Sequence, residues 1–242
     1  GTTFSFNYFD TRFTDRIGRP LTENARAILT DPAARPFVTF VNPSANPADQ
    51  ALIESYSGLP GFSTLYPINT YGAVVDGRWV NTGAVRVRGL DASALYSRPV
   101  GAGVISLDAS ASWILDYETR LTPTAPVRQA AGLIGYPAEF RARSGATWTW
   151  EDLDLALHWT HVAAYRDNLG ARIGALNSLD ARFGWSLGRD GAGGRGLRLS
   201  LAVENLLDED PPFYDAPTGY GFDAGQASLL GRAVSLQLIK RW

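Results

Sequence analysis

Cysteine and methionine are both absent from the 242 residues, and histidine occurs only twice. Without cysteine the chain has no disulfide, no thiolate metal site and no cysteine nucleophile. Translation normally starts with methionine, whereas residue 1 is Gly. We therefore expect the chain to be processed or cut from a longer one. It contains no signal peptide, and a secreted precursor would have had one upstream.

A strong excess of charge and a long apolar run are also missing. The 22 Lys and Arg residues nearly balance the 24 Asp and Glu residues, so nothing suggests nucleic acid or another polyanion as a partner. Hydrophobic residues make up 45% of the chain, yet no apolar run reaches the roughly 18 residues of a membrane helix. Any membrane crossing must therefore use β-strands.

What the sequence does contain is alternation with a period of two, which predicts strands with one apolar and one polar face. In 104–117, for example, Leu107 and Trp113 share a face that lies opposite Ser106 and Asp108. Eight segments show the pattern: 3–13, 85–96, 104–117, 140–150, 153–160, 178–187, 196–206 and 231–242.

One predicted strand, 85–96, is out of phase in its first half. Arg86 and Arg88 fall in register with the apolar side of that strand. A bulge or a covering piece of protein would reconcile the two halves. We expect one of these near Gly89.

Long and short connections alternate between the predicted strands. The long ones are 18–80, 119–136, 167–176 and 209–230, and the short ones are 98–103, 151–152 and 189–195. Outer-membrane β-barrels have short periplasmic turns and longer extracellular loops. The pattern therefore predicts a periplasmic C-terminus.

The longest connection, 18–80, is rich in proline. Its seven prolines argue against a central strand. Within it, Asn46 can cap a helix, Pro47 suits the first helical turn and Gly58 suits the exit. We predict one short helix in this loop.

The apolar faces are expected to contact lipid. Strands of about ten residues fit a tilted membrane strand, and aromatic residues at strand ends are typical of membrane interfaces. One such girdle holds Tyr96, Trp148, Trp150, Trp185 and Trp242, and the other Trp113, Tyr117, Trp159 and Tyr165. The alternative for the same alternation is a secreted β-sandwich that buries these faces and binds carbohydrate.

The opposite faces carry charges of both signs. In a barrel these side chains would line a wet lumen or hold an inserted plug, whereas cross-strand charge pairing is the alternative. The candidates are Asp108, Arg141, Arg143, Asp154, Asp180, Arg182, Arg198 and Glu204.

Aromatic residues in the predicted outer loops are the ligand-binding candidates, because binding residues often lie on loops held by a rigid scaffold. Packing of each loop on itself is the alternative. These residues are Tyr56, Tyr66, Tyr71, Tyr214, Tyr220 and Phe222.

Enzyme and cofactor signatures are not evident. The glycines of 191–196 match a dinucleotide pattern, but a strand follows them and a turn is the better interpretation. His158 and His161 lie three apart on a strand, so they point to opposite faces and do not share a metal. We predict no catalytic residue, metal site or cofactor, and a lumen position for His158.

A resemblance to a known family emerges from motifs that follow one another along the chain. The end of the chain combines Val203-Glu-Asn-Leu-Leu-Asp208, a long loop, and a strand from Gly231-Arg232 to Trp242. Three earlier motifs point to the same family. They are Tyr8-Phe9 with Asp15-Arg-Ile17, Asn81-Thr-Gly83 with Arg88-Gly-Leu-Asp91, and Pro36-Phe-Val-Thr-Phe-Val-Asn-Pro-Ser44. This ordered set resembles the C-terminal part of a TonB-dependent outer-membrane receptor.

The resemblance implies that residues 1–242 are the last eight strands of a barrel of roughly 22, with the plug domain and earlier strands absent from the chain. It implies uptake of a scarce nutrient such as a ferric siderophore. The implied partners are outer-membrane lipid, the plug of the same full-length chain, the TonB complex through the missing N-terminal part, and a small ligand such as a metal chelate. A complete eight-stranded outer-membrane barrel with a structural or adhesive role is the rival hypothesis.

Overall fold

The computed structural model describes residues 1–19, 28–60, 62, 64–121, 125–187, 196–216 and 219–241. Contacts divide the chain into two compact units. The sheet unit comprises Gly1–Thr11, Arg86–Tyr117 and Ala130–Trp242, and the loop unit comprises Arg12–Val85 and Glu118–Gln129.

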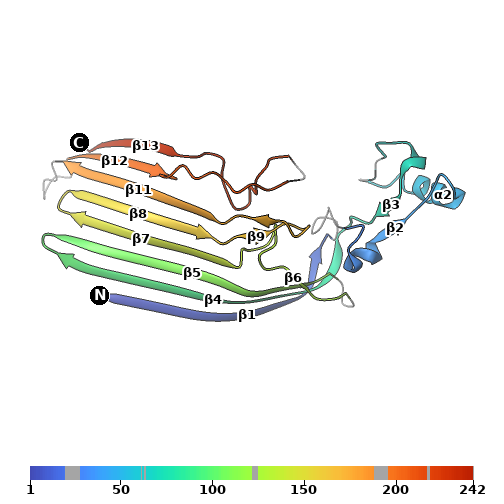
Figure 1. Ribbon diagram of the computed structural model, residues 1–242, viewed down its shortest axis with the longest axis horizontal. Helices are drawn as coiled ribbons and strands as arrows, with labels where there is room; N and C mark the ends of the chain where they lie inside the picture. Colours follow the sequence, from blue (N-terminus) through green and yellow to red (C-terminus); the bar gives the residue numbers. More distant parts are fainter. Residues whose placement is uncertain are drawn as a thin grey trace. The chain divides into compact units, whose positions relative to one another are not determined.

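One antiparallel sheet contains all eight of the predicted strands in chain order, β1-β4-β5-β7-β8-β11-β12-β13 (Figure 1). This meander confirms the predicted all-β fold of eight antiparallel strands joined in chain order. The strands are β1 (Thr2–Gly18), β4 (Val80–Val100), β5 (Gly103–Arg120), β7 (Phe140–Trp150), β8 (Leu153–Val162), β11 (Leu176–Leu187), β12 (Gly196–Glu204) and β13 (Ala233–Arg241).

The pairing register puts apolar residues opposite apolar residues. Phe183 of β11 pairs with Leu155 of β8 and with Leu201 of β12, and Leu201 pairs in turn with Leu236 of β13. Because a one-residue slip would turn every side chain to the other face, this register fixes which face is apolar.

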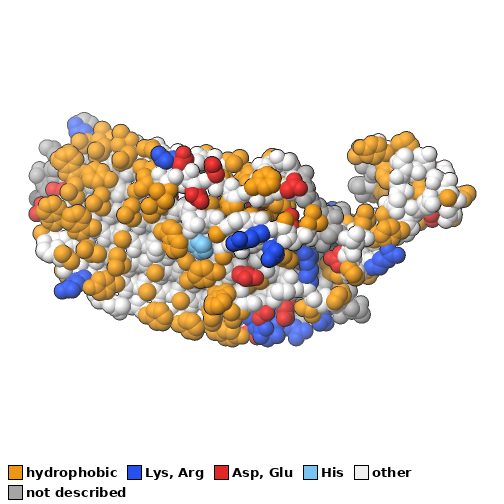
Figure 2. All heavy atoms as spheres, viewed as in Figure 1, with side chains coloured by type: hydrophobic (Ala, Val, Ile, Leu, Met, Phe, Trp, Pro, Cys, Tyr) orange, Lys and Arg blue, Asp and Glu red, His pale blue; other side chains and the backbone are white. Residues whose placement is uncertain are grey.

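The apolar face is exposed over its whole width in the described sheet. Phe6 is 61% exposed, Leu107 44%, Leu157 48% and Leu236 70%. Figure 2 shows hydrophobic side chains spread over the strands of the sheet on one face. A surface of this extent marks contact with lipid or with another protein.

The short turns that join neighbouring strands are tight where the structure describes them. β4 and β5 are joined through a turn at Gly101, and β7 and β8 through Glu151 and Asp152. At this end Trp150 and Trp185 both pair with Leu153, and Trp148 stacks on Trp150 with ring centroids 5.8 Å apart. The expected turn at 189–195 and the terminal Trp242 lie outside the described residues.

Arg86 and Arg88 are accommodated by ion pairs. Arg86 Nη2 lies 2.5 Å from Asp10 Oδ2, and Arg88 forms an ion pair with Asp116. β4 runs without interruption through Gly89. Carboxylates on the neighbouring strands therefore pair with the two arginines that break the apolar alternation of β4.

The loop unit has a small core of its own, in which Ile28, Ala34 and Val38 pack with Ala73, Val75 and Leu121. The predicted helix is confirmed as α2 (Pro47–Ser55), with the Asn46 side chain accepting from Ala48 N. Tyr56 is its C-cap, two residues before the expected exit at Gly58. The other elements are η1 (Pro32–Phe37), η2 (Ile68–Thr70), β6 (Arg128–Gln129), and the paired strands β2 (Val38–Phe40) and β3 (Ala73–Val75).

Candidate ligand-binding face

Opposite the apolar face, the strands align polar side chains in rows. Ser112 of β5 pairs with Arg141 of β7, and Ser110 pairs with Arg143. Arg143 pairs in turn with Thr160 of β8. The rows exist because polar residues recur every second position and the register keeps them level.

Glycine makes room for charged side chains within this face. A Cβ on Gly145 of β7 would lie 2.4 Å from Asp108 Oδ1 and 2.6 Å from His158 Nδ1. Gly145 is opposite Asp108 on one side and His158 on the other. The carboxylate and the imidazole therefore lean over the glycine from both neighbouring strands. Among the described residues, His158 Nδ1 is buried and has no hydrogen-bond partner.

A second glycine has the same role nearer the turns. A Cβ on Gly184 of β11 would lie 2.2 Å from Asp154 Oδ2. The Asp154 carboxylate reaches across this position and accepts a 2.8 Å hydrogen bond from Arg198 Nη2 on β12. Arg198 also donates to Ser186 Oγ at 3.3 Å. The glycine thus permits an ion pair between strands that are not adjacent.

The other lumen candidates are not paired with one another. Asp180 accepts from Asn205 N at 2.9 Å, and Arg141 donates to Gln226 Oε1. Within the described part of the chain Arg198 with Asp154 is the one ion pair among the eight candidates. Cross-strand charge pairing therefore accounts for few of them.

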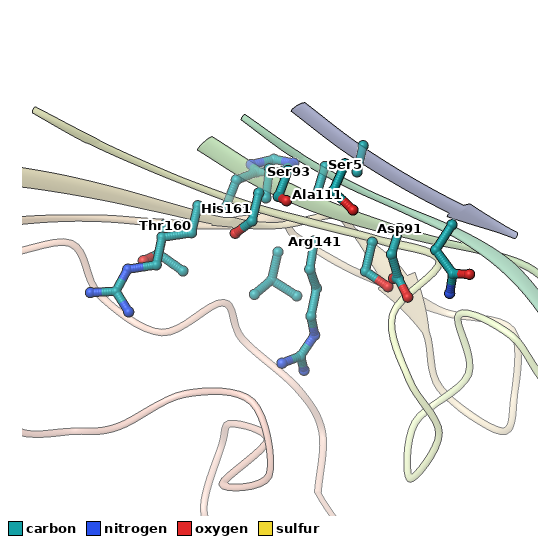
Figure 3. Close-up of a pocket in the computed structure, with 14 residues that line it drawn as sticks. Ser5, Asp91, Ser93, Ala111, Arg141, Thr160 and His161 are labelled. Atoms are coloured by element: carbon teal, nitrogen blue, oxygen red, sulfur yellow. The ribbon is translucent and has the colours of Figure 1, made fainter. Parts of the chain in front are cut away.

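A hollow of about 450 Å³ lies on this polar face. It is lined from β1, β4, β5, β7 and β8, and its polar lining includes Asn7, Asp91, Ser112, Arg141 and Arg143. Figure 3 shows Arg141 extending away from the strands towards the segment that joins β12 to β13. All its lining residues belong to the sheet unit.

The connection between β12 and β13 is closed at its base by two of the sequence motifs. Asn205, with φ of 50°, ends β12, and its side chain accepts from Glu209 N and donates to Glu209 O. Asp208 Oδ1 accepts from Arg232 N at 2.8 Å. The Glu204-Asn-Leu-Leu-Asp208 and Gly231-Arg232 motifs therefore join the two ends of this long loop.

The same connection is tied to the sheet unit farther along. Tyr165 donates to Asp223 Oδ2 at 2.8 Å, from β9 (Tyr165–Arg166), which pairs with β10 (Arg172–Ile173). Tyr165 is only 7% exposed. Burial, followed by the bond to the Asp223 carboxylate, raises the pKa of the Tyr165 hydroxyl well above its usual value. Tyr165 is therefore a proton donor throughout the neutral range.

Three of the aromatic candidates belong to this connection. Tyr220 is 69% exposed, and Tyr214 N donates to Gly221 O at 2.9 Å. Phe222 is half-buried and immediately precedes Asp223. They thus lie on the same loop as Gln226, which contacts the hollow at Arg141.

The other three aromatic candidates belong to the loop unit. Tyr71 accepts through its hydroxyl from Tyr66 N at 3.0 Å, and Tyr56 packs against Phe62 with ring centroids 5.8 Å apart. Tyr66 itself is 69% exposed. Packing within the loop therefore occupies Tyr56 and Tyr71, whereas the Tyr66 ring is available.

The two histidines separate as the strand period predicts. His161 stacks on Trp159 with centroids 5.5 Å apart and contacts Asn177 Oδ1 through Nδ1 at 2.9 Å. His158 lies over Gly145 instead. No cluster of three metal-ligating side chains occurs in the described ranges. In those same ranges no helix is long and apolar enough to cross a membrane.

A meander with an exposed apolar face, a polar face and long connections defines a segment of a membrane β-barrel. The TonB dependent receptor-like, beta-barrel family model matches residues 1–206, and the chain belongs to that family. The family consists of bacterial outer-membrane receptors that carry out TonB-linked transport with a plug, and it is not a family of enzymes. No curated protein matches the chain.

Proposed function

We propose that residues 1–242 are the C-terminal segment of a receptor barrel that takes up a scarce nutrient, such as a ferric siderophore, with energy from TonB. The apolar face contacts outer-membrane lipid, and the polar face encloses the plug of the same full-length chain. TonB acts through the N-terminal part of that chain. The C-terminus is periplasmic and the long connections are extracellular.

The observation that carries this proposal is the difference between the two faces of one sheet. Large hydrophobic side chains are exposed on one face, and Phe4, on the edge strand, is 69% exposed. On the other face Arg143 and Arg182 have no ion-pair partner among the described residues. A wet lumen with an inserted plug provides solvent and partners for such charges, whereas a packed interior does not.

Strand pairing favours this proposal over a complete eight-stranded barrel. Closure of such a barrel requires β1 to pair with β13, because a membrane barrel has no open edge. In the described residues β1 pairs only with β4, and β13 only with β12. In the larger barrel, further strands next to β1 and β13 pair with the backbone N–H and C=O groups at these two edges.

Uptake measurements test the transport function. Cells that express the full-length receptor as their sole ferric-chelate receptor are expected to accumulate radioactive iron from a supplied chelate. Deletion of the TonB gene is expected to abolish accumulation without changing the amount of receptor in the outer membrane. Equal accumulation with and without TonB would contradict the proposal, as would no accumulation from any chelate supplied.

A further inference from the structure

The polar hollow contains two guanidinium groups on one strand and a row of small hydroxyl groups. Arg141 and Arg143 of β7 are two residues apart, so both side chains project from the same face. Ser110 and Ser112 lie directly opposite them on β5. Arginine forks with neighbouring hydroxyl groups are donors suited to carboxylate, catecholate or phosphate oxygens.

These donors are largely unused inside the described part of the chain. Arg143 is exposed and has neither a hydrogen-bond nor an ion-pair partner there, and the hydroxyl groups of Ser110 and Ser112 likewise have no side-chain partner there. Asp91 is the one carboxylate that lines the hollow, against two arginines. The hollow is therefore a net cationic, donor-rich surface with space for a ligand.

Arg141 has a neutral partner that an anion can replace. Its guanidinium donates to the side-chain oxygen of Gln226. Gln226 lies in a tight turn, in which Gln226 N donates to Asp223 O at 3.1 Å, and Tyr165 holds Asp223. Because the arginine fork can form two parallel hydrogen bonds and an ion pair with an anion, but donates only one hydrogen bond to the neutral Gln226 amide, an anion outcompetes Gln226 for Arg141.

We propose that Arg141 and Arg143 bind the anionic part of the transported ligand, and that the ligand displaces Gln226 from Arg141 on entry. The proposal rests on the proposed function and gives its substrate class as a negatively charged chelate. Displacement of Gln226 breaks the hydrogen bond between Arg141 and the β12–β13 connection. This connection carries Tyr214, Tyr220 and Phe222. Those aromatic rings then contact the ligand from the loop side.

Two ferric complexes that differ in charge test this site. An Fe(III) tris-catecholate carries three negative charges, and an Fe(III) tris-hydroxamate is neutral. Binding of each to the purified full-length receptor is followed by quenching of tryptophan fluorescence. We expect the wild type to bind the catecholate complex at least tenfold more tightly, and Arg141→Gln combined with Arg143→Gln to remove that preference. The double variant should bind the neutral complex as the wild type does.

Arg182→Gln is the matched control. Arg182 is an exposed arginine on the same polar face, and it lies outside the lining of the hollow. We expect this variant to keep wild-type preference for the catecholate complex. An equal loss in Arg182→Gln would mean that general lumen charge, and not this pair, selects the ligand, and it would overturn the proposal.

Further outcomes separate the arginine site from the transport function. If both ferric complexes bind equally, or if the double variant is destabilised with its preference intact, the pair serves another partner such as an acidic plug residue, and the proposal is wrong. If neither complex binds but citrate binds to the wild type and not to the double variant, the anion site stands and iron-chelate uptake fails. No binding of any anionic probe overturns the anion site even where cells accumulate iron.

Discussion

At the scale of single residues, strand glycines decide which side chains meet. Gly145 and Gly184 leave room on the polar face for Asp108, His158 and Asp154. The sequence identifies these charged residues as lumen-facing through their period. It cannot identify the glycines opposite them, because strand register depends on residues far apart in the chain. His158 was predicted to face the lumen, but its position over Gly145 follows only from the register.

Gly89 offers a test of this role. A Cβ at this position would lie 2.5 Å from Phe9 Cζ and 2.7 Å from Trp113 O. The backbone oxygen cannot move as a side-chain tip can. We expect Gly89→Ala to lower the free energy of unfolding by about 1–3 kcal/mol, the usual cost of overpacking. Urea unfolding in detergent micelles measures it.

Gly72→Ala is the control for this substitution, since nothing lies within 4 Å of a Cβ at Gly72. Its free energy of unfolding should stay within about 0.5 kcal/mol of the wild-type value. Equal midpoints for the two variants would show that the Phe9 ring and the Trp113 carbonyl do not enclose Gly89.

At the scale of elements, the eight long strands were predictable because each alternates over many residues. The strand ends were less predictable. β1 continues to Gly18 and β4 begins at Val80, so both extend beyond the apolar alternation. Backbone pairing continues there, although lipid no longer selects the side chains. β2, β3, β6, β9 and β10 were missed. They are two or three residues long, which is too short for a period to show.

The attachment of the β12–β13 connection was also missed, although its aromatic residues and its base motif were identified. Tyr165 was assigned to an interfacial girdle, whereas its hydroxyl binds Asp223. A hydrogen bond between residues 58 positions apart has no local signature. The sequence therefore predicted the loop and some of its candidate binding residues, but not what holds the loop in place.

Tyr165→Phe tests that attachment. A hydrogen bond to a charged group contributes about 1.5–3 kcal/mol, so its loss should raise the chymotrypsin cleavage rate at Tyr220 or Phe222 roughly tenfold or more. Tyr66→Phe is the control, because Tyr66 is exposed and its hydroxyl has no partner among the described residues. Equal cleavage rates in the two variants would contradict the attachment.

The pH dependence of the same attachment has a defined sign. The pKa of Tyr165 is raised in the folded protein, so the protonated donor is favoured by folding. Its contribution is fully present below the ordinary tyrosine value of about 10, and it is lost as pH rises through the higher folded-state value. Loop cleavage in the wild type should therefore not change between roughly pH 7 and 9 on account of Tyr165. A rise across that range that is absent in Tyr165→Phe would contradict this.

At the scale of the whole molecule, the two faces of the sheet have different solvents. Leu107 and Ser106 are neighbours on β5, and Leu107 pairs with Ala146 in the middle of β7. An arginine facing lipid near the midplane costs about 2–4 kcal/mol. We expect Leu107→Arg to lose that much folding free energy in lipid vesicles, whereas Ser106→Arg on the polar face loses less than about 1 kcal/mol. Equal losses would contradict a lipid-facing side.

The most direct test of the account is cysteine labelling in intact cells, since the chain has no cysteine of its own. Thr64 lies in the long connection between β1 and β4, and Asp152 lies in the short turn between β7 and β8; both are exposed. With a membrane-impermeant maleimide, Thr64→Cys should be labelled on intact cells, and Asp152→Cys only after the outer membrane is opened. Labelling of Asp152→Cys but not Thr64→Cys on intact cells would contradict an outer-membrane receptor with its long loops outside.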